Sequence, residues 1–357
     1  MKMDVKLNTA KQLVILSLEP IETRYTCQWF KWLPRYFNFC IQDIEVVQID
    51  GTTDLSPATE GAFLNFIATN HWKSSQATEF FDRVSKGLIS DDAVILITDF
   101  WNPVVHMIRY TNDLMGKNWK IVGIAHAGMY DPQDCLGRQF KNKVWGTHLE
   151  TAMFEAYDKV VFATDWHIEL FCLGRKDIIN HDKILKSGLP FDFLHSSLNY
   201  ALDKENIILF PHRLAPEKQH DVFLEVSKYF PDYEFVTCQD KNLSKSDYHK
   251  LLCKSKVVFS ASLQETLGIS TCAEALIAGA FPFAPDNLSY EEILPSVCKY
   301  PARYAVEKDA QNIAKYLRFV LDNLTSLNRS INSHYILGKY FSAGPLISYI
   351  EEQLHNV

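Results

Sequence analysis

The chain has 357 residues, of which 47% are apolar, and its formal net charge at pH 7 is −7. This length suits two domains that share a cleft, and the apolar content suffices for two cores. The mildly negative charge argues against tight, sequence-independent binding of nucleic acid.

Short apolar runs separated by helical patterns predict a first domain over residues 1–190. Helices are expected at 22–37 and 75–87, and strands at 13–18, 44–49, 93–98, 120–126 and 159–164. Because these buried strands alternate with helices, we expect a parallel sheet covered on both faces.

The same pattern restarts after a turn-rich linker at 186–194 and predicts a second domain over residues 200–332. Its strands are expected at 207–213, 233–238, 256–262 and 280–285. The last segment, 333–357, is predicted to be mainly helical with a break near Gly344–Pro345. The predicted fold class is therefore α/β, with two Rossmann-like, doubly wound domains facing a cleft.

The eight cysteines include no CxxC pair, and the N-terminus lacks the features of a signal peptide. We therefore expect a reducing, cytoplasmic location, which would be the host cytoplasm for a phage protein. No apolar run reaches the roughly 18 residues that a membrane span needs, so no transmembrane segment is expected.

Two cations follow the first predicted strand of the second domain. Arg213 ends the segment IILFPHR, and Lys218 comes five residues later, before a helical pattern. In open α/β sheets, ligands bind beyond the carboxyl ends of the strands. A preorganised Arg/Lys pair there stabilises the negative charge that grows on a departing diphosphate.

Two carboxylates, Glu265 and Glu274, flank a glycine turn after the strand at 256–262. Gly268 permits a tight turn, and the amides of Ile269 and Ser270 in the next helical turn suit a phosphate. Carboxylates accept hydrogen bonds from hydroxyls, so Glu274 suits a ribose and Glu265 a sugar. Together with the two cations, this pattern indicates a site for a nucleotide-sugar and favours a glycosyltransferase.

The first domain also carries polar residues at its predicted strand ends. His126 ends the strand at 120–126 and is a candidate to contact the sugar or orient the acceptor. Arg138 also belongs to a basic–aromatic patch with Phe140, Lys141, Lys143 and Trp145, which suits an anionic acceptor. The acceptor-side candidates are Glu19, Thr23, Arg24, Asp131 and Arg138.

Three segments resemble the retaining GT-B glycosyltransferases that carry a Glu-x7-Glu motif. They are IILFPHRLAPEKQHDVFLE, SGLPFD and YHKLLCKSKVVFSASLQETLG. The resemblance implies a GT-B fold whose C-terminal helix crosses back to the first domain. It also implies that Arg213 and Lys218 bind the diphosphate, Glu265 the sugar and Glu274 the ribose, and that His126 lies near the donor sugar. One departure is that eight residues, not seven, separate Glu265 from Glu274.

The predicted reaction is therefore sugar transfer with retention from a UDP- or GDP-sugar, with no cofactor and no metal. The segment APDNLSYEEILP (284–295) looks similar to glycosyltransferases that act on modified tRNA bases. The chain also resembles phage enzymes that glycosylate hydroxymethylated pyrimidines in DNA. The favoured acceptor is thus a modified nucleobase, such as 5-hydroxymethylpyrimidine in DNA, or a tRNA base.

Three alternatives remain open. A polysaccharide or glycolipid glycosyltransferase would need an apolar, membrane-facing helix patch, for which residues 29–37 are the candidate. A non-catalytic nucleotide-sugar binding module would need Arg213, Lys218 and Glu274 but no transfer geometry. A sugar-nucleotide epimerase on the same fold would form product from the donor alone.

Overall fold

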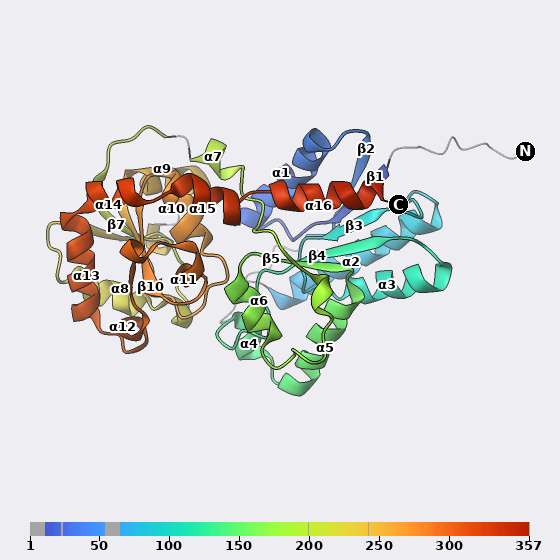
Figure 1. The fold of residues 1–357 in the computed structure, drawn as a ribbon, viewed down its shortest axis with the longest axis horizontal. Helices are drawn as coiled ribbons and strands as arrows, with labels where there is room; N and C mark the ends of the chain where they lie inside the picture. The colour runs from blue at the N-terminus through green and yellow to red at the C-terminus, as the bar shows by residue number, and fades with distance from the viewer. Residues whose placement is uncertain (1–10, 23, 54–64, 199, 242, 357) are drawn as a thin grey trace, which may run out of the picture.

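The computed structural model describes residues 11–22, 24–53, 65–198, 200–241 and 243–356. Two units lie side by side along the long axis of the molecule, each built around a parallel β-sheet (Figure 1). We call the unit around the first sheet the N-terminal domain and the unit around the second sheet the C-terminal domain. The last helix runs from the C-terminal domain back across the N-terminal domain (Figure 1).

The first sheet has six parallel strands in the order β2-β1-β3-β4-β5-β6. They are β1 (Lys11–Leu16), β2 (Ile44–Ile49), β3 (Val94–Ile97), β4 (Lys120–Ile124), β5 (Lys159–Phe162) and β6 (Ile184–Lys186). Successive side chains of a strand point to opposite faces, so the apolar run in β1 feeds two cores. Leu13 and Ile15 join one apolar cluster, and Val14 and Leu16 join the other.

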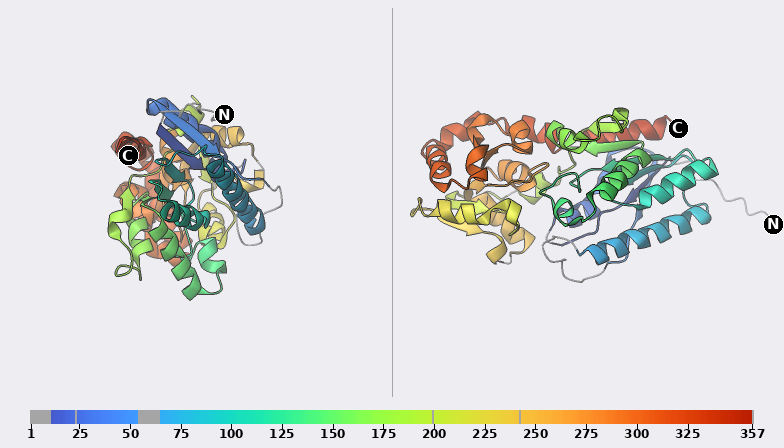
Figure 2. Two further views of the ribbon diagram at one scale, coloured as in Figure 1. Left: turned by 90° about the vertical axis from the view of Figure 1, so that its right-hand side faces the viewer. Right: turned by 90° about the horizontal axis from the view of Figure 1, so that it is seen from below.

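Helices cover both faces of the first sheet, as Figure 2 also shows. Buried residues of α1 and α16 join the cluster of Leu13, whereas those of α2, α3, α5 and α6 join the cluster of Val14. The helical elements around the first sheet are α1 (Tyr25–Cys40), α2 (Phe66–Ser85), α3 (Val104–Met115), α4 (Cys135–Gln139), α5 (Lys143–Ala156), α6 (Asp165–Cys172), η1 (His181–Lys183) and α16 (Gly344–His355).

The second sheet has five parallel strands in the order β11-β10-β9-β7-β8. They are β7 (Glu205–Phe210), β8 (Glu234–Thr237), β9 (Ser255–Phe259), β10 (Phe281–Asp286) and β11 (Lys299–Pro301). The helical elements around it are α7 (Leu194–Ser197), η2 (Pro216–Lys218), α8 (His220–Ser227), η3 (Gln239–Lys241), α9 (Lys245–Lys254), η4 (Ile269–Glu274), α10 (Ala275–Ile277), α11 (Ser289–Ile293), η5 (Ser296–Cys298), α12 (Ala302–Val306), α13 (Ala310–Asp322), α14 (Leu324–Ser330) and α15 (Ser333–Tyr340).

The predicted α/β class with two doubly wound sheets is confirmed, although two short strands were not predicted. These are β6, which lies at the start of the segment interpreted as a linker, and β11. Each has only three residues, which is too short for periodicity to reveal. The predicted break near Gly344 is confirmed, because α15 ends at Tyr340 and α16 begins at Gly344 and contacts β1 and β3.

In each sheet the strand order reverses at one equivalent point. In the first sheet it lies between β1 and β3, and in the second between β7 and β9. Loops that leave such a pair of strands diverge to opposite faces and open a crevice at the carboxyl edge of the sheet. The loops after β1, β3, β7 and β9 are therefore where a ligand between the domains is expected.

Candidate active site

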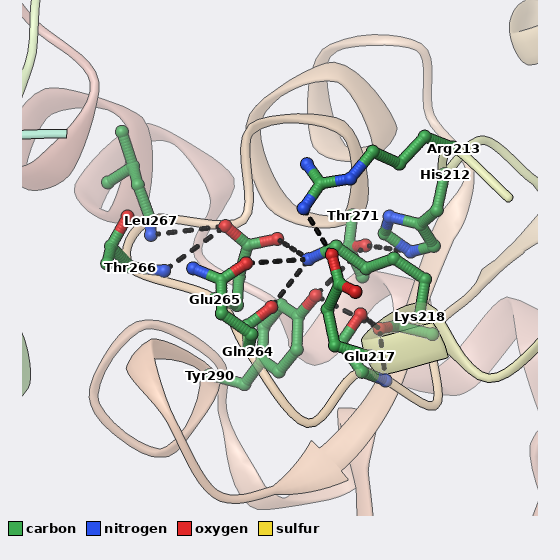
Figure 3. A network of polar contacts seen from close by, with 12 residues as sticks. His212, Arg213, Glu217, Lys218, Gln264, Glu265, Thr266, Leu267, Thr271 and Tyr290 are labelled. Atoms are coloured by element: carbon green, nitrogen blue, oxygen red, sulfur yellow. Dashed lines mark hydrogen bonds and ion pairs between the residues drawn. The ribbon is translucent and has the colours of Figure 1, made fainter. Parts of the chain in front are cut away.

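Lys218 lies at the centre of the polar network that follows β7 and β9 (Figure 3). The η2 turn, which starts at Pro216, carries Lys218 into a position where its side chain is 5% exposed. Its Nζ donates to the backbone oxygen of Gln264 at 2.5 Å and lies 3.3 Å from Glu265 Oε2. The structure thus joins the predicted cation of one loop to the predicted carboxylate of the next.

Glu265 is held as a carboxylate. Burial alone raises the pKa of its carboxyl, but the charge of Lys218, with a smaller contribution from His212, lowers it below the usual value. The backbone amide of Thr266 also donates to Glu265 Oε1 at 3.2 Å (Figure 3). An ionised acceptor beside a buried ammonium is suited to a hydroxyl-bearing ligand with a charged leaving group.

Arg213 lies beside the same network and contacts Glu217 within it (Figure 3). The Glu217 side chain is fully buried, and its other oxygen contacts Arg138 of the N-terminal domain. Burial alone raises the pKa of Glu217, but Arg213, Arg138 and Lys218 together hold it below its usual value. The structure therefore places Arg138, an acceptor-side candidate, against the loop that carries the diphosphate candidates.

A π-helical turn lies between Glu265 and Glu274, a segment with one residue more than the Glu-x7-Glu spacing. Gly268 has φ +70°, and a Cβ there would lie 2.7 Å from Tyr290 Cε1, so the turn requires glycine. The next element, η4, is a π-helix over Ile269–Glu274. Its hydrogen bonds close one residue later than those of an α-helix, so a single such turn accommodates one additional residue.

Glu274 is already engaged on both carboxylate oxygens. Lys245 Nζ lies 3.0 Å from Oε1, and the Tyr248 hydroxyl donates to Oε2 at 2.5 Å. Burial alone raises the pKa of this carboxyl, but Lys245 and Tyr248 lower it below its usual value. A ribose that binds Glu274 must therefore share the carboxylate with these two side chains of α9 or displace them.

His126 of the N-terminal domain has both ring nitrogens paired. Nε2 lies 2.8 Å from the carbonyl oxygen of Thr98, and Nδ1 lies 2.9 Å from the Tyr25 hydroxyl. Because a carbonyl only accepts, Nε2 carries the proton and Nδ1 accepts from Tyr25. Burial also lowers the pKa of His126, which favours the neutral ring. Its backbone carbonyl accepts a hydrogen bond from Thr266 Oγ1 at 2.6 Å, next to Glu265.

The loop after β1 supplies two further candidates. Arg24 directly precedes α1, and burial together with the charge of Arg213 lowers its pKa to about 10. Arg24 is therefore in electrostatic range of a donor-side cation. Glu19 accepts a hydrogen bond from Thr69 Oγ1 at 2.9 Å, which ties it to α2. Thr23 lies outside the described residues.

Asp131 is buried in the loop between β4 and α4. Its Oδ1 accepts from the Gln133 amide at 2.9 Å, and its Oδ2 is buried with no hydrogen-bond partner among the described residues. Burial raises the pKa of Asp131 to about 6, and the Gln264 side chain lies near enough to oppose this shift. This candidate therefore faces the second-domain loop that carries Glu265.

Sequence reasoning missed Tyr25, Gln264, Lys245 and Tyr248. Two of them had a readable signal, because Lys245 and Tyr248 are three residues apart and so share one face of α9. Tyr25 and Gln264 stand next to singled-out residues, but only the fold reveals their contacts. Among the described residues, no group of three or more His, Cys, Asp and Glu side chains is placed to hold a metal ion. None of the described helices is long and apolar enough to span a membrane.

Comparison with solved structures identifies the fold. No family model matches the sequence. Sucrose-phosphate synthase from Thermosynechococcus elongatus matches with a TM-score of 0.66 at 12% identity, covering 97% of this chain and 98% of that one. A glycosyltransferase from Rickettsia africae matches with a TM-score of 0.62 at 14% identity, covering 98% and 100%.

A third match is the HepE protein of Anabaena, solved with UDP and glucose. It has a TM-score of 0.60 at 12% identity, covering 97% of this chain and 98% of that one. At these identities the likeness concerns the fold. The expectation of two Rossmann-like domains with a returning C-terminal helix is thus confirmed, and the chain has the GT-B fold of glycosyltransferases.

Proposed function

We propose that the protein is a glycosyltransferase that uses a nucleotide-sugar donor and retains the configuration of the sugar. The observation that carries this proposal is the buried contact between Lys218 and Glu265 at the strand-order reversal of the second sheet. Thr266, the next residue, hydrogen-bonds His126 of the other domain. A cation, a carboxylate and both domains thus meet where a ligand of this fold would lie.

In this proposal the diphosphate lies against Arg213, Lys218 and the amides of Ile269 and Ser270, with Gly268 allowing its approach. The bond from the anomeric carbon to the diphosphate breaks, and its electron pair leaves with the phosphate oxygen. The acceptor hydroxyl forms the new bond on the same face and passes its proton to that oxygen. The cations stabilise the developing charge without a metal.

Glu265 then faces the sugar and Glu274 the ribose. His126 is neutral, and both of its ring nitrogens are hydrogen-bonded. Its bond to the Tyr25 hydroxyl holds the Tyr25 side chain in position near the sugar. The donor is a UDP- or GDP-sugar. The HepE protein has been solved with UDP-glucose, so UDP-glucose is the first donor to test.

For the acceptor we propose a modified nucleobase, such as 5-hydroxymethylpyrimidine in phage DNA or a base in tRNA. An aromatic stack supports a planar acceptor, because the rings of Phe140 and Trp145 lie 5.4 Å apart with 9° between their planes. Trp145 is 55% exposed, and Lys141, four residues earlier in the chain, is exposed too. Aromatic faces next to cations are a sequence-tolerant platform for bases, and a duplex base would have to flip out.

A glycolipid or polysaccharide acceptor is the second candidate. The segment 29–37, offered by the sequence as a membrane-facing patch, does not suit that role, because Trp29, Leu33 and Phe37 are buried. A different surface favours an apolar acceptor. The helix α3 exposes Met107, Tyr110, Leu114 and Met115.

The test is a binding screen of UDP-, GDP- and ADP-sugars, followed by transfer to hydroxymethyl-containing DNA, tRNA and simple glycans. Binding of a nucleotide-sugar and transfer to either nucleic acid would support the whole proposal. Transfer to a glycan or glycolipid alone would mean that the acceptor is a glycan or glycolipid and not a nucleobase. Donor binding without turnover on any acceptor would favour a binding module, and product from the donor alone would favour an epimerase.

A further inference from the structure

Glu217 links two arginines from different domains. The Arg213 guanidinium contacts its Oε1, and the Arg138 guanidinium contacts its Oε2. The carboxylate is fully buried, whereas the side chains of Arg213 and Arg138 are 32% and 26% exposed. A buried carboxylate thus anchors two cations that still reach the surface of the site.

Several cations gather around the Glu217 carboxylate. It contacts two guanidinium groups, while Lys218 lies against Glu265. Arg24 adds a further cation within electrostatic range of Arg213, and the Asp134 carboxyl lies within range of Arg213 as well. Cations held in fixed positions are suited to an anion such as a diphosphate.

Arg138 also retains hydrogen-bonding capacity. Its contacts among the described residues use Nη1, which donates to the Gln133 carbonyl at 2.6 Å and contacts Glu217. A guanidinium has five N–H donors in a planar fork, so Nε and Nη2 remain for phosphate oxygens. Because α4 belongs to the N-terminal domain, this cation reaches the donor loop from the other domain.

We propose that Arg138 is a third diphosphate-binding cation, supplied by the N-terminal domain, and that Glu217 is the anchor that holds it and Arg213 in position. This inference rests on the proposed function. Donor binding would then tie the two domains together, since one diphosphate would contact cations from both. Arg138 would thus belong to the donor site, and the acceptor would lie further along the same domain, toward Phe140.

The test compares Arg138→Gln and Arg138→Lys with wild type in calorimetric titrations of a nucleoside diphosphate, the monophosphate and the nucleoside. Arg138→Gln is expected to weaken diphosphate binding at least tenfold and nucleoside binding less than twofold. Arg138→Lys keeps the charge but loses the fork, so its loss should be intermediate. Lys176→Gln, which removes an exposed cation of the same domain that belongs to no proposed site, is the matched control and should change neither.

Glu217→Gln supplies a second, independent arm. It keeps one oxygen that can accept from one arginine, but its amide nitrogen only donates and cannot hold the other, so diphosphate affinity should fall. Unchanged or higher diphosphate affinity would mean that Glu217 does not anchor the two cations. If Arg138→Gln binds the diphosphate as wild type does, or weakens all three ligands equally, Arg138 is only an interdomain ion pair and the inference fails. If wild type binds no nucleoside diphosphate or nucleotide-sugar, the proposed function itself fails.

Discussion

Thr266 Oγ1 donates a hydrogen bond to the backbone carbonyl of His126 at 2.6 Å, across the interface between the domains. His126 follows β4 of the first sheet, and Thr266 follows Glu265 in the loop after β9 of the second. The carboxyl edges of the two sheets are therefore joined at the residues for which chemistry is proposed. The geometry at Glu265 thus depends on both domains, and substitutions there report on the whole site.

Replacing Lys218 with methionine should weaken donor binding and make stability depend on pH in a new way. A hydrogen bond to a charged group contributes about 1.5–3 kcal/mol, so nucleotide affinity should fall by about tenfold to a hundredfold. The substitution also leaves the Glu265 carboxylate, whose side chain is 19% exposed, without its cation, at a cost of about 3 kcal/mol. Urea unfolding at pH 7 and pH 5, with nucleotide titration, measures both effects.

The destabilisation caused by Lys218→Met should change with pH in a definite direction. In wild type the pKa of Glu265 is lowered, so its contribution to stability is present at neutral pH and lost as pH falls through that pKa. Without Lys218, burial raises the pKa, so the destabilisation of the variant should shrink as pH falls. The double variant Lys218→Met/Glu265→Gln should recover most of the stability at pH 7. A deficit in the single variant that grows toward acid would contradict the role of this pair.

Replacing Tyr248 with phenylalanine should destabilise the unliganded protein. A ribose-containing ligand should then stabilise the variant by more than it stabilises wild type. The hydroxyl bond to Glu274 Oε2 is short, at 2.5 Å, and such bonds to a charged group contribute about 1.5–3 kcal/mol. A ribose hydroxyl that takes the vacated place would restore this energy. The rise in melting temperature with saturating nucleoside diphosphate should therefore be larger than in wild type.

The 2′-deoxy and 3′-deoxy nucleoside diphosphates are the ligand controls, because each lacks one hydroxyl, and at least one should lose this gain. Tyr229→Phe is the protein control, since that side chain, just after α8, is 43% exposed. Equal ligand-induced shifts in wild type and Tyr248→Phe would mean that the ribose does not use this oxygen of Glu274.

The architecture was predictable because its signals are local. Runs such as VILI in β3 are buried on both faces, and the alternation with helices identifies a parallel sheet without any knowledge of pairing. Strand-end residues were predictable for the same reason, so Arg213, Lys218 and Glu265 could be singled out together. The sheet topology then brings Lys218 and Glu265 into contact.

Contacts between the domains could not be predicted in this way. Arg138 reads as part of a basic–aromatic patch, and nothing in its neighbourhood indicates that Glu217, 79 residues away, lies against it. The partners of Glu274 could not be predicted either, since they depend on how α9 packs against η4. Long-range ion pairs are set by tertiary structure, and a single sequence carries no periodic signal for them.

Replacing Asp131 with asparagine should stabilise the protein at neutral pH. Burial raises the pKa of Asp131 to about 6, above its value in the unfolded chain, so the folded state binds more protons near pH 5. Wild-type stability should therefore rise as pH falls from 7 toward 4, and the asparagine variant should lose this rise. The gain at pH 7.5 is at most about 3 kcal/mol. Asp177→Asn, at an exposed position, is the matched control.

Chemical unfolding of Asp131→Asn at pH 5 and pH 7.5 measures this difference. The asparagine variant should converge with wild type at the acid end, where the wild-type Asp131 carboxyl is protonated and resembles the amide. A variant that is less stable than wild type at pH 7.5 would mean that the Asp131 carboxylate has a partner that stabilises its charge.

Deleting Ser270 should be tolerated, because it removes the residue that the π-helical turn accommodates. The deletion leaves seven residues between Glu265 and Glu274 and allows an α-helix to start directly after Gly268, with Glu274 still facing Lys245 and Tyr248. The free energy of unfolding should change by less than about 2 kcal/mol. Nucleoside diphosphate binding should persist, because the backbone amide of Thr271 then follows Ile269 and takes the place of the Ser270 amide.

The matched control is deletion of Ala275, which lies just beyond the π-helical turn, in α10, and is fully buried. Removing a residue from regular α-helix rotates everything that follows by about 100° and turns Ile277 and Ala278 away from their packing partners. This variant should lose its cooperative unfolding transition. If the two deletions are equally damaging, the turn does not absorb an extra residue, and Glu274 owes its position to the π-helix itself.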